Sequence, residues 1–107
     1  MQTVVDERTS TIAQANDEFR KAGWGVTVTL GIQTLDDVNG LMHAIRAYDK
    51  FTSDNDPYGE HDFGSLLWDK EKVLWKIDYY NRGLSGGVSA LSPLCQRVLT
   101  VMLADEY

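Results

Sequence analysis

The segment DNDPYGEHDFG, residues 54–64, separates two hydrophobic patterns and constrains the fold more than any other stretch. Before it, apolar residues recur at the three- and four-residue spacing of helices. After it, they alternate with the two-residue period of strands. Pro57 and Gly59 interrupt any continuous helix between the two halves. The chain therefore combines helices with strands and belongs to the α+β class.

The first half predicts a helix, a strand and a second helix. Residues 9–22 carry an apolar stripe at helical spacing, formed by Ile12, Ala15, Phe19 and Ala22. Residues 24–32 alternate and predict a half-buried strand with a core face of Trp24, Val26, Val28, Leu30 and Ile32. Residues 34–51 predict the second helix, since Thr34 and Asp37 form a start like a capping box.

The second half predicts a β-hairpin of residues 63–68 and 72–80, joined by a short polar link. Alternation in the second strand predicts one face toward the core and one away from it. The core face holds Val73, Trp75, Ile77 and Tyr79, and the other face holds Lys76, Asp78 and Tyr80. Residues 93–106 fit a buried helix that is apolar on most sides, and the run 98–102 within them fits a central strand as an alternative. The Ser92-Pro93 start favours the helix, on which Cys95 would be a small buried side chain. The predicted order is α-β-α-β-β-α in one domain, 1–107, with a mostly antiparallel sheet of about three strands.

Charge and cysteine content exclude several classes of protein. The 107 residues carry a formal net charge of −6, which argues against direct nucleic-acid binding, because that needs basic residues against phosphates. The single cysteine excludes an internal disulfide and a cysteine-based zinc cluster. No apolar run is long enough to span a membrane, and no signal core is present. We therefore expect a soluble cytoplasmic protein that does not bind membranes.

Several blocks together resemble an uncharacterised family of small bacterial proteins, a domain of unknown function often encoded on plasmids and other mobile elements. They are NDEFR at 16–20, DNDPYGEHDFG at 54–64, WKIDYY at 75–80 and RVLTVMLADEY at 97–107. The resemblance implies no reaction, ligand or catalytic residue. It implies a genetic setting in which small acidic proteins commonly act against host defences.

Ten residues in and near the acidic segment form the predicted binding surface. They combine carboxylates with tyrosines, a composition typical of interface hot spots with a charged rim. The residues are Asp54, Asn55, Asp56, Tyr58, Glu60, His61, Asp62, Asp78, Tyr80 and Arg82. No catalytic residue, metal ligand or cofactor is assigned. An ordered loop whose Asp and Asn side chains bond their own backbone is the simpler interpretation.

Two hypotheses of function follow from this surface. The first is a non-enzymatic inhibitor, of anti-CRISPR or anti-restriction type, that binds a protein or ribonucleoprotein complex of the bacterial host. Its carboxylates would stand where nucleic-acid phosphates bind. The alternative is a small metal-dependent hydrolase or nuclease, using the acids of residues 54–62 and His61 around a divalent ion.

Overall fold

The computed structural model describes residues 7–23 and 25–107. In chain order its elements are α1 (Glu7–Ala22), β1 (Val26–Val28), α2 (Leu30–Gln33), α3 (Val38–Arg46), β2 (Phe63–Trp68), β3 (Glu71–Tyr80), β4 (Gln96–Leu103) and the 3-10 turn η1 (Ala104–Glu106).

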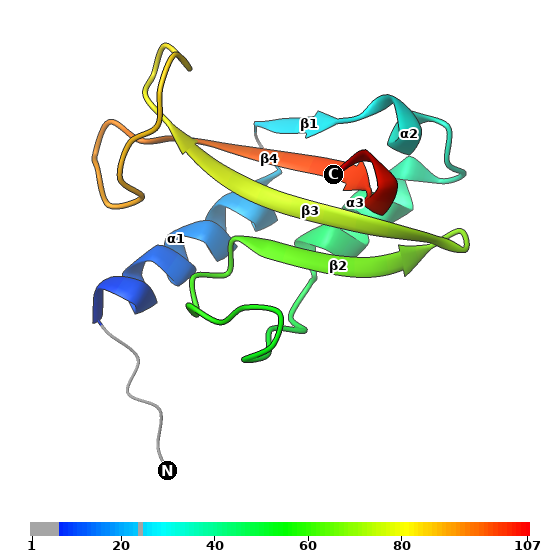
Figure 1. The fold of residues 1–107 in the computed structure, drawn as a ribbon, viewed down its shortest axis with the longest axis horizontal. Helices are drawn as coiled ribbons and strands as arrows, with labels where there is room; N and C mark the ends of the chain where they lie inside the picture. Colours follow the sequence, from blue (N-terminus) through cyan, green and yellow to red (C-terminus); the bar gives the residue numbers. More distant parts are fainter. Residues whose placement is uncertain (1–6, 24) are drawn as a thin grey trace.

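The four strands form one mixed sheet in the order β1-β4-β3-β2. β1 runs parallel to β4, whereas the β4–β3 and β3–β2 pairs are antiparallel. The α+β class is confirmed, with four strands rather than three. In Figure 1, α1 and α3 lie behind the sheet and the other sheet face is turned toward the viewer.

The core lies between α3 and the covered face of the sheet. Since side chains alternate along a strand, Val73, Trp75 and Ile77 point to one side, and all three are buried as the sequence predicts. Leu41 and Ile45 of α3 pack onto this face and are fully buried.

The prediction of a helix over residues 93–106 is wrong. Ser92 and Pro93 lie in a turn, where the Ser92 hydroxyl accepts from the N–H of Leu94, and the chain then enters β4. β4 is a central strand that pairs on both sides, so an apolar run suits it as well as it would suit a buried helix. The alternative of a central strand at Val98–Met102 is the observed one.

The predicted strand at residues 24–32 is shorter in the structure, and its first residue, Trp24, lies outside the described residues. β1 ends at Val28, and the chain turns into α2, which leaves Leu30 exposed while Ile32 is buried. The carboxylate of Glu106 stabilises this turn, since it accepts from the Thr29 hydroxyl and the Gly31 N–H. This contact spans most of the chain, and no local pattern predicts it.

The second helix is also shorter than predicted. Thr34 belongs to the end of α2, and the N-cap of α3 is Asp37, whose carboxylate accepts from the N–H of Gly40 at 3.0 Å. α3 ends at Arg46 rather than near Phe51.

The side chain of Arg20 explains that early end. From α1 it donates Nε–H to the carbonyl of Ile45 and Nη2–H to the carbonyl of Tyr48, both at 3.0 Å. Carbonyl groups at a helix C-terminus need such partners. No helix in the described part of the chain is long and apolar enough to cross a membrane.

Candidate functional site

The connection from α3 to β2 carries most of the predicted surface, and we call residues 52–62 the acidic loop. Its first turn is closed by its own side chains. Asn55 accepts from the N–H of Thr52 and donates to the carbonyl of Lys50, both at 2.8 Å. Asn55 therefore orders the loop, as the simpler interpretation predicts.

Asp56 points inward and is not part of an exposed rim. Its side chain is 5% exposed, and both carboxylate oxygens accept from the N–H of His61, at 3.3 and 3.2 Å. His61 itself has the left-handed backbone angle φ 55°, which is uncommon outside glycine. The bonds from Asp56 hold this conformation.

The His61 imidazole is enclosed by two carboxylates and an aromatic ring. Its Nδ1 lies 3.0 Å from each oxygen of Asp17 in α1, and its Nε2 lies 3.7 Å from Oδ2 of Asp56. The ring stacks on Phe51 at 3.9 Å between centroids, with an interplanar angle of 2°. Since both nitrogens face carboxylates, His61 anchors the loop to α1 rather than presenting a free base.

Arg20 holds the Asp17 side of this anchor. It is 1% exposed and donates to Asp17 at 3.0 Å, so Asp17 bridges the guanidinium and the imidazole. The guanidinium also lies over the rings of Phe51 and Trp75, at 5.4 and 5.0 Å from their centroids. An open cavity of about 320 Å³ lies beside this group, lined by Asp17, Arg20, Lys21, Tyr48, Asp49, Phe51 and His61.

Other parts of the loop face solvent. Tyr58 is 81% exposed and Asp54 is exposed, whereas Glu60 and Asp62 are half-buried. Burial raises the pKa of the Glu60 carboxyl, and repulsion from Asp62 and Asp56 raises it further.

The pKa of Asp62 is raised in the same way, first by burial and then by Asp56 and Asp78, against the lowering effects of its own backbone N–H and of His61. Glu60 and Asp62 are therefore held close to other carboxylates, at an electrostatic cost.

The remaining predicted residues lie on or just beyond β3. Asp78 pairs with Lys76 at 3.2 Å on the open face of the sheet, the same-face neighbour that the alternation predicts. Tyr80 forms an isolated bridge with Gly87, and Arg82 lies exposed in the following turn. Among the described residues, no hydrogen bond or ion pair joins Tyr80 or Arg82 to the acidic loop, so the predicted surface divides into two parts.

The hypothesis of a metal-dependent enzyme requires several ligand side chains gathered around one ion. Among residues 7–23 and 25–107, no group of three or more His, Cys, Asp or Glu side chains could hold a metal ion. His43, the other histidine, is exposed on α3.

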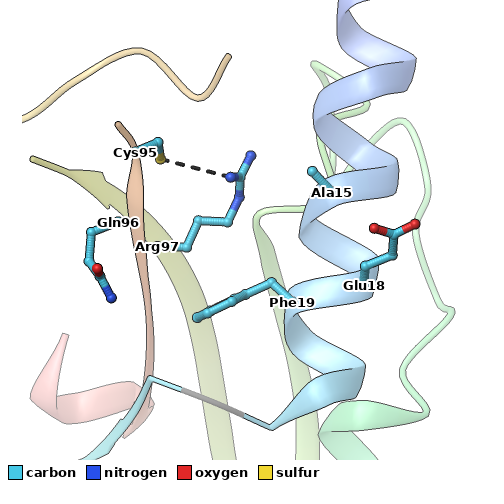
Figure 2. Close-up of a pocket in the computed structure, with 6 residues that line it drawn as sticks. All are labelled: Ala15, Glu18, Phe19, Cys95, Gln96 and Arg97. Carbon is cyan, nitrogen blue, oxygen red and sulfur yellow. Dashed lines mark hydrogen bonds between the residues drawn. The ribbon is translucent and has the colours of Figure 1, made fainter. Parts of the chain in front are cut away.

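A second cavity, of about 420 Å³, lies between α1 and the start of β4, with Phe19 and Arg97 on its two sides (Figure 2). Cys95 lines it from the turn before β4. The prediction of a buried cysteine on a helix is therefore wrong. Arg97 approaches the sulfur at 3.8 Å and donates to Asn16 at 2.7 Å and to the carbonyl of Ala90 at 2.9 Å.

Sequence reasoning missed the polar residues of α1 that hold the acidic loop. The buried face of α1 differs from the predicted apolar stripe. Its buried positions are Ala13, Asn16 and Arg20. Asn16 donates to the carbonyl of Glu60 at 2.9 Å and to the hydroxyl of Tyr79 at 2.8 Å. The sequence did contain a signal for these residues, the NDEFR block at 16–20. That block supports the family resemblance, but none of its residues was predicted to belong to the binding surface.

The fold and the site together define a small α+β domain with an acidic loop fixed to its first helix. Residues 27–106 match the family described as protein of unknown function (DUF3768), and the chain belongs to that family. The resemblance to an uncharacterised family is thus confirmed, and α1 with Asp17 and Arg20 lies before the matched region. No curated protein and no solved structure matches the chain.

Proposed function

We propose that this protein is a non-enzymatic inhibitor that docks its acidic loop onto a basic surface of another protein. The observation that carries the proposal is the division of the loop into anchored and exposed parts. Asp56 and His61 are tied inward, while Tyr58 remains 81% exposed and Asp54 is exposed in the same loop. A fixed loop with an exposed aromatic side chain binds with a smaller loss of conformational entropy than a flexible one.

Unneutralised charge supports a basic partner. Burial, and then repulsion from nearby carboxylates, raise the pKa values of Glu60 and Asp62. A lysine or arginine of a partner would relieve this repulsion, as complementary charges do at interfaces. The net charge of −6 would steer such a partner toward the protein.

Basic surfaces of this kind occur on proteins that handle nucleic acid. The resemblance implies a mobile-element setting. The partner we propose is therefore a host protein or ribonucleoprotein complex in the cytoplasm. The protein would act as a counter-defence inhibitor of anti-CRISPR or anti-restriction type, with its carboxylates in place of phosphates.

The test is affinity capture from the native host with two charge-matched variants. One carries Asp54→Lys, Glu60→Lys and Asp62→Lys. The control carries Glu18→Lys, Glu71→Lys and Asp105→Lys at other exposed positions. Each triple moves the formal net charge from −6 to 0, since every replacement adds two positive charges.

We expect the loop variant to lose the captured partner and the control to retain it, with both keeping the wild-type circular dichroism spectrum. Added nucleic acid should compete with the wild-type protein for the partner. Equal capture by the two variants would reject the acidic loop as the contact surface.

A further inference from the structure

β2 is an edge strand without the features that usually protect a sheet edge. Its six residues, FGSLLW, contain no charged residue and no proline, and they pair with β3 in unbroken register. Natural edge strands are commonly short, charged, bulged or covered, because an open edge pairs with other chains. The opposite edge, β1, is only three residues long and is protected by its shortness.

The backbone groups on the free side of β2 can be assigned from the ladder. The N–H of Ile77 donates to the carbonyl of Asp62 at 2.8 Å. Hydrogen-bonded positions alternate in an antiparallel pair, so residues 62, 64, 66 and 68 face β3, and 63, 65 and 67 face outward. Within the described chain, no loop or helix hydrogen-bonds to the backbone of these three residues.

We propose that β2 pairs with β2 of a second copy of this chain, antiparallel and centred on Ser65. In this register Ser65 meets Ser65 of the other copy, and Phe63 meets Leu67. All of the ladder bonds use groups that face outward. The pairing joins two four-stranded sheets into one continuous sheet of eight strands.

Two further properties of the strand fit this register. Leu67 is 75% exposed on the open sheet face, and the pairing places it beside the half-buried Phe63 of the other copy. The antiparallel direction brings the β2–β3 turn of one copy, which carries the exposed Lys70, to the end where the acidic loop of the other copy enters β2 with Glu60. A lysine and a carboxylate with a raised pKa therefore lie at the same end of the pairing, at both of its ends.

The first experiment measures mass in solution by sedimentation over a range of concentrations. The wild-type protein should approach twice the 12.0 kDa of one chain. Leu67→Lys should weaken dimerisation at least about tenfold, because it places a charge in the apolar contact. The matched control is Leu30→Lys, since Leu30 is 78% exposed but lies in α2, and it should remain dimeric.

Charge exchange tests the ends of the pairing. Lys70→Glu should weaken the dimer by placing like charges at the same end of the pairing, and adding Glu60→Lys to that variant should restore it. A monomeric wild-type protein, or equal behaviour of the Leu67 and Leu30 variants, would overturn the proposal.

The second experiment tests the register by cross-linking in a Cys95→Ser background. Directly opposed residues of a hydrogen-bonded pair have Cα atoms about 5.5 Å apart, within reach of a disulfide. Ser65→Cys should therefore oxidise to a covalent dimer, and Leu67→Cys, which faces Phe63 rather than itself, should not. Cross-linking of both to the same extent would exclude this register. Neither outcome depends on partner capture, so this proposal and the proposed function can fail separately.

Discussion

His61 is held by interactions from three parts of the chain. Asp17 comes from α1, Phe51 from the segment after α3, and Asp56 from the acidic loop itself. The backbone of His61 stays in the left-handed region because the N–H has a buried acceptor. A residue that the hydrolase hypothesis places around a divalent ion thus acts as an anchor of the acidic loop in the structure.

Replacing Arg20 should cost more stability than any other single change near the acidic loop. Arg20→Met removes donors from the carbonyls of Ile45 and Tyr48 and leaves Asp17 without its cation. We expect a loss of about 3–5 kcal/mol in the free energy of unfolding, measured by urea denaturation. Arg20→Lys should recover little of it, because an ammonium group lacks the planar fork that reaches both carbonyls. An Arg20→Met protein with nearly the wild-type free energy of unfolding would contradict this role of Arg20.

The raised pKa values of Glu60 and Asp62 make stability depend on pH. Above their ordinary values of 4.5 and 3.8, the folded state binds more protons than the unfolded state, so stability falls as pH rises toward the raised values. Glu60→Gln and Asp62→Asn should therefore stabilise the protein at neutral pH and flatten its pH profile. Denaturation midpoints between pH 3.5 and pH 7 test this, with the exposed Asp54→Asn as the unchanged control.

At the scale of elements, α3 begins at Asp37, a residue that must both cap the helix and adopt an uncommon backbone angle. Asp37 caps the helix by accepting from the Gly40 N–H, and its backbone takes the left-handed angle φ 55°. Aspartate and asparagine tolerate this angle better than most residues, and both cap helices well.

Asp37→Ala should lower the free energy of unfolding by about 1–2 kcal/mol, since alanine neither caps nor favours a positive φ. Asp37→Asn should stay within about 0.5 kcal/mol of the wild type because it does both. Thermal or urea denaturation measures the difference. Equal losses in the two variants would show that charge, rather than capping, is what Asp37 contributes.

At the scale of the whole molecule, β4 joins parts that are far apart in the sequence. It pairs with β1 on one side and β3 on the other, and it leads into η1, whose Glu106 holds the turn before α2. The hydrogen bond from the Thr29 hydroxyl lowers the pKa of Glu106, as do backbone N–H groups.

Two leucines near β4 distinguish the observed strand from the helix that the sequence favoured. Leu99 is 1% exposed in the centre of β4, while Leu94 is 60% exposed in the turn before it. Leu99→Ala should cost about 2–5 kcal/mol in the free energy of unfolding. Leu94→Ala should change it by less than about 0.5 kcal/mol. A large loss at Leu94 would contradict the observed placement of this segment.

The acidic loop illustrates how far sequence reasoning reached. It identified the segment, its separation of helical from strand patterns, and the exposed Asp54 and Tyr58. It did not separate Asp56, which is buried, from the exposed acids, and it grouped Tyr80 and Arg82 with a loop that they do not contact by any hydrogen bond or ion pair in the described structure. Composition shows which groups are present but not which of them find partners.

The sequence by itself determined the α+β class, the β2–β3 hairpin and the buried face of β3, because these follow from the local periodicity of side chains. Only the tertiary structure decided that residues 96–103 form a strand, since an apolar run satisfies a helix or a central strand until its neighbours are known. Tertiary structure also turned Asn16, Asp17 and Arg20 into supports of the acidic loop. Apart from the Asp17–Arg20 pair, their partners lie more than 20 residues away in the chain, and buried polar groups are stable only where such partners meet.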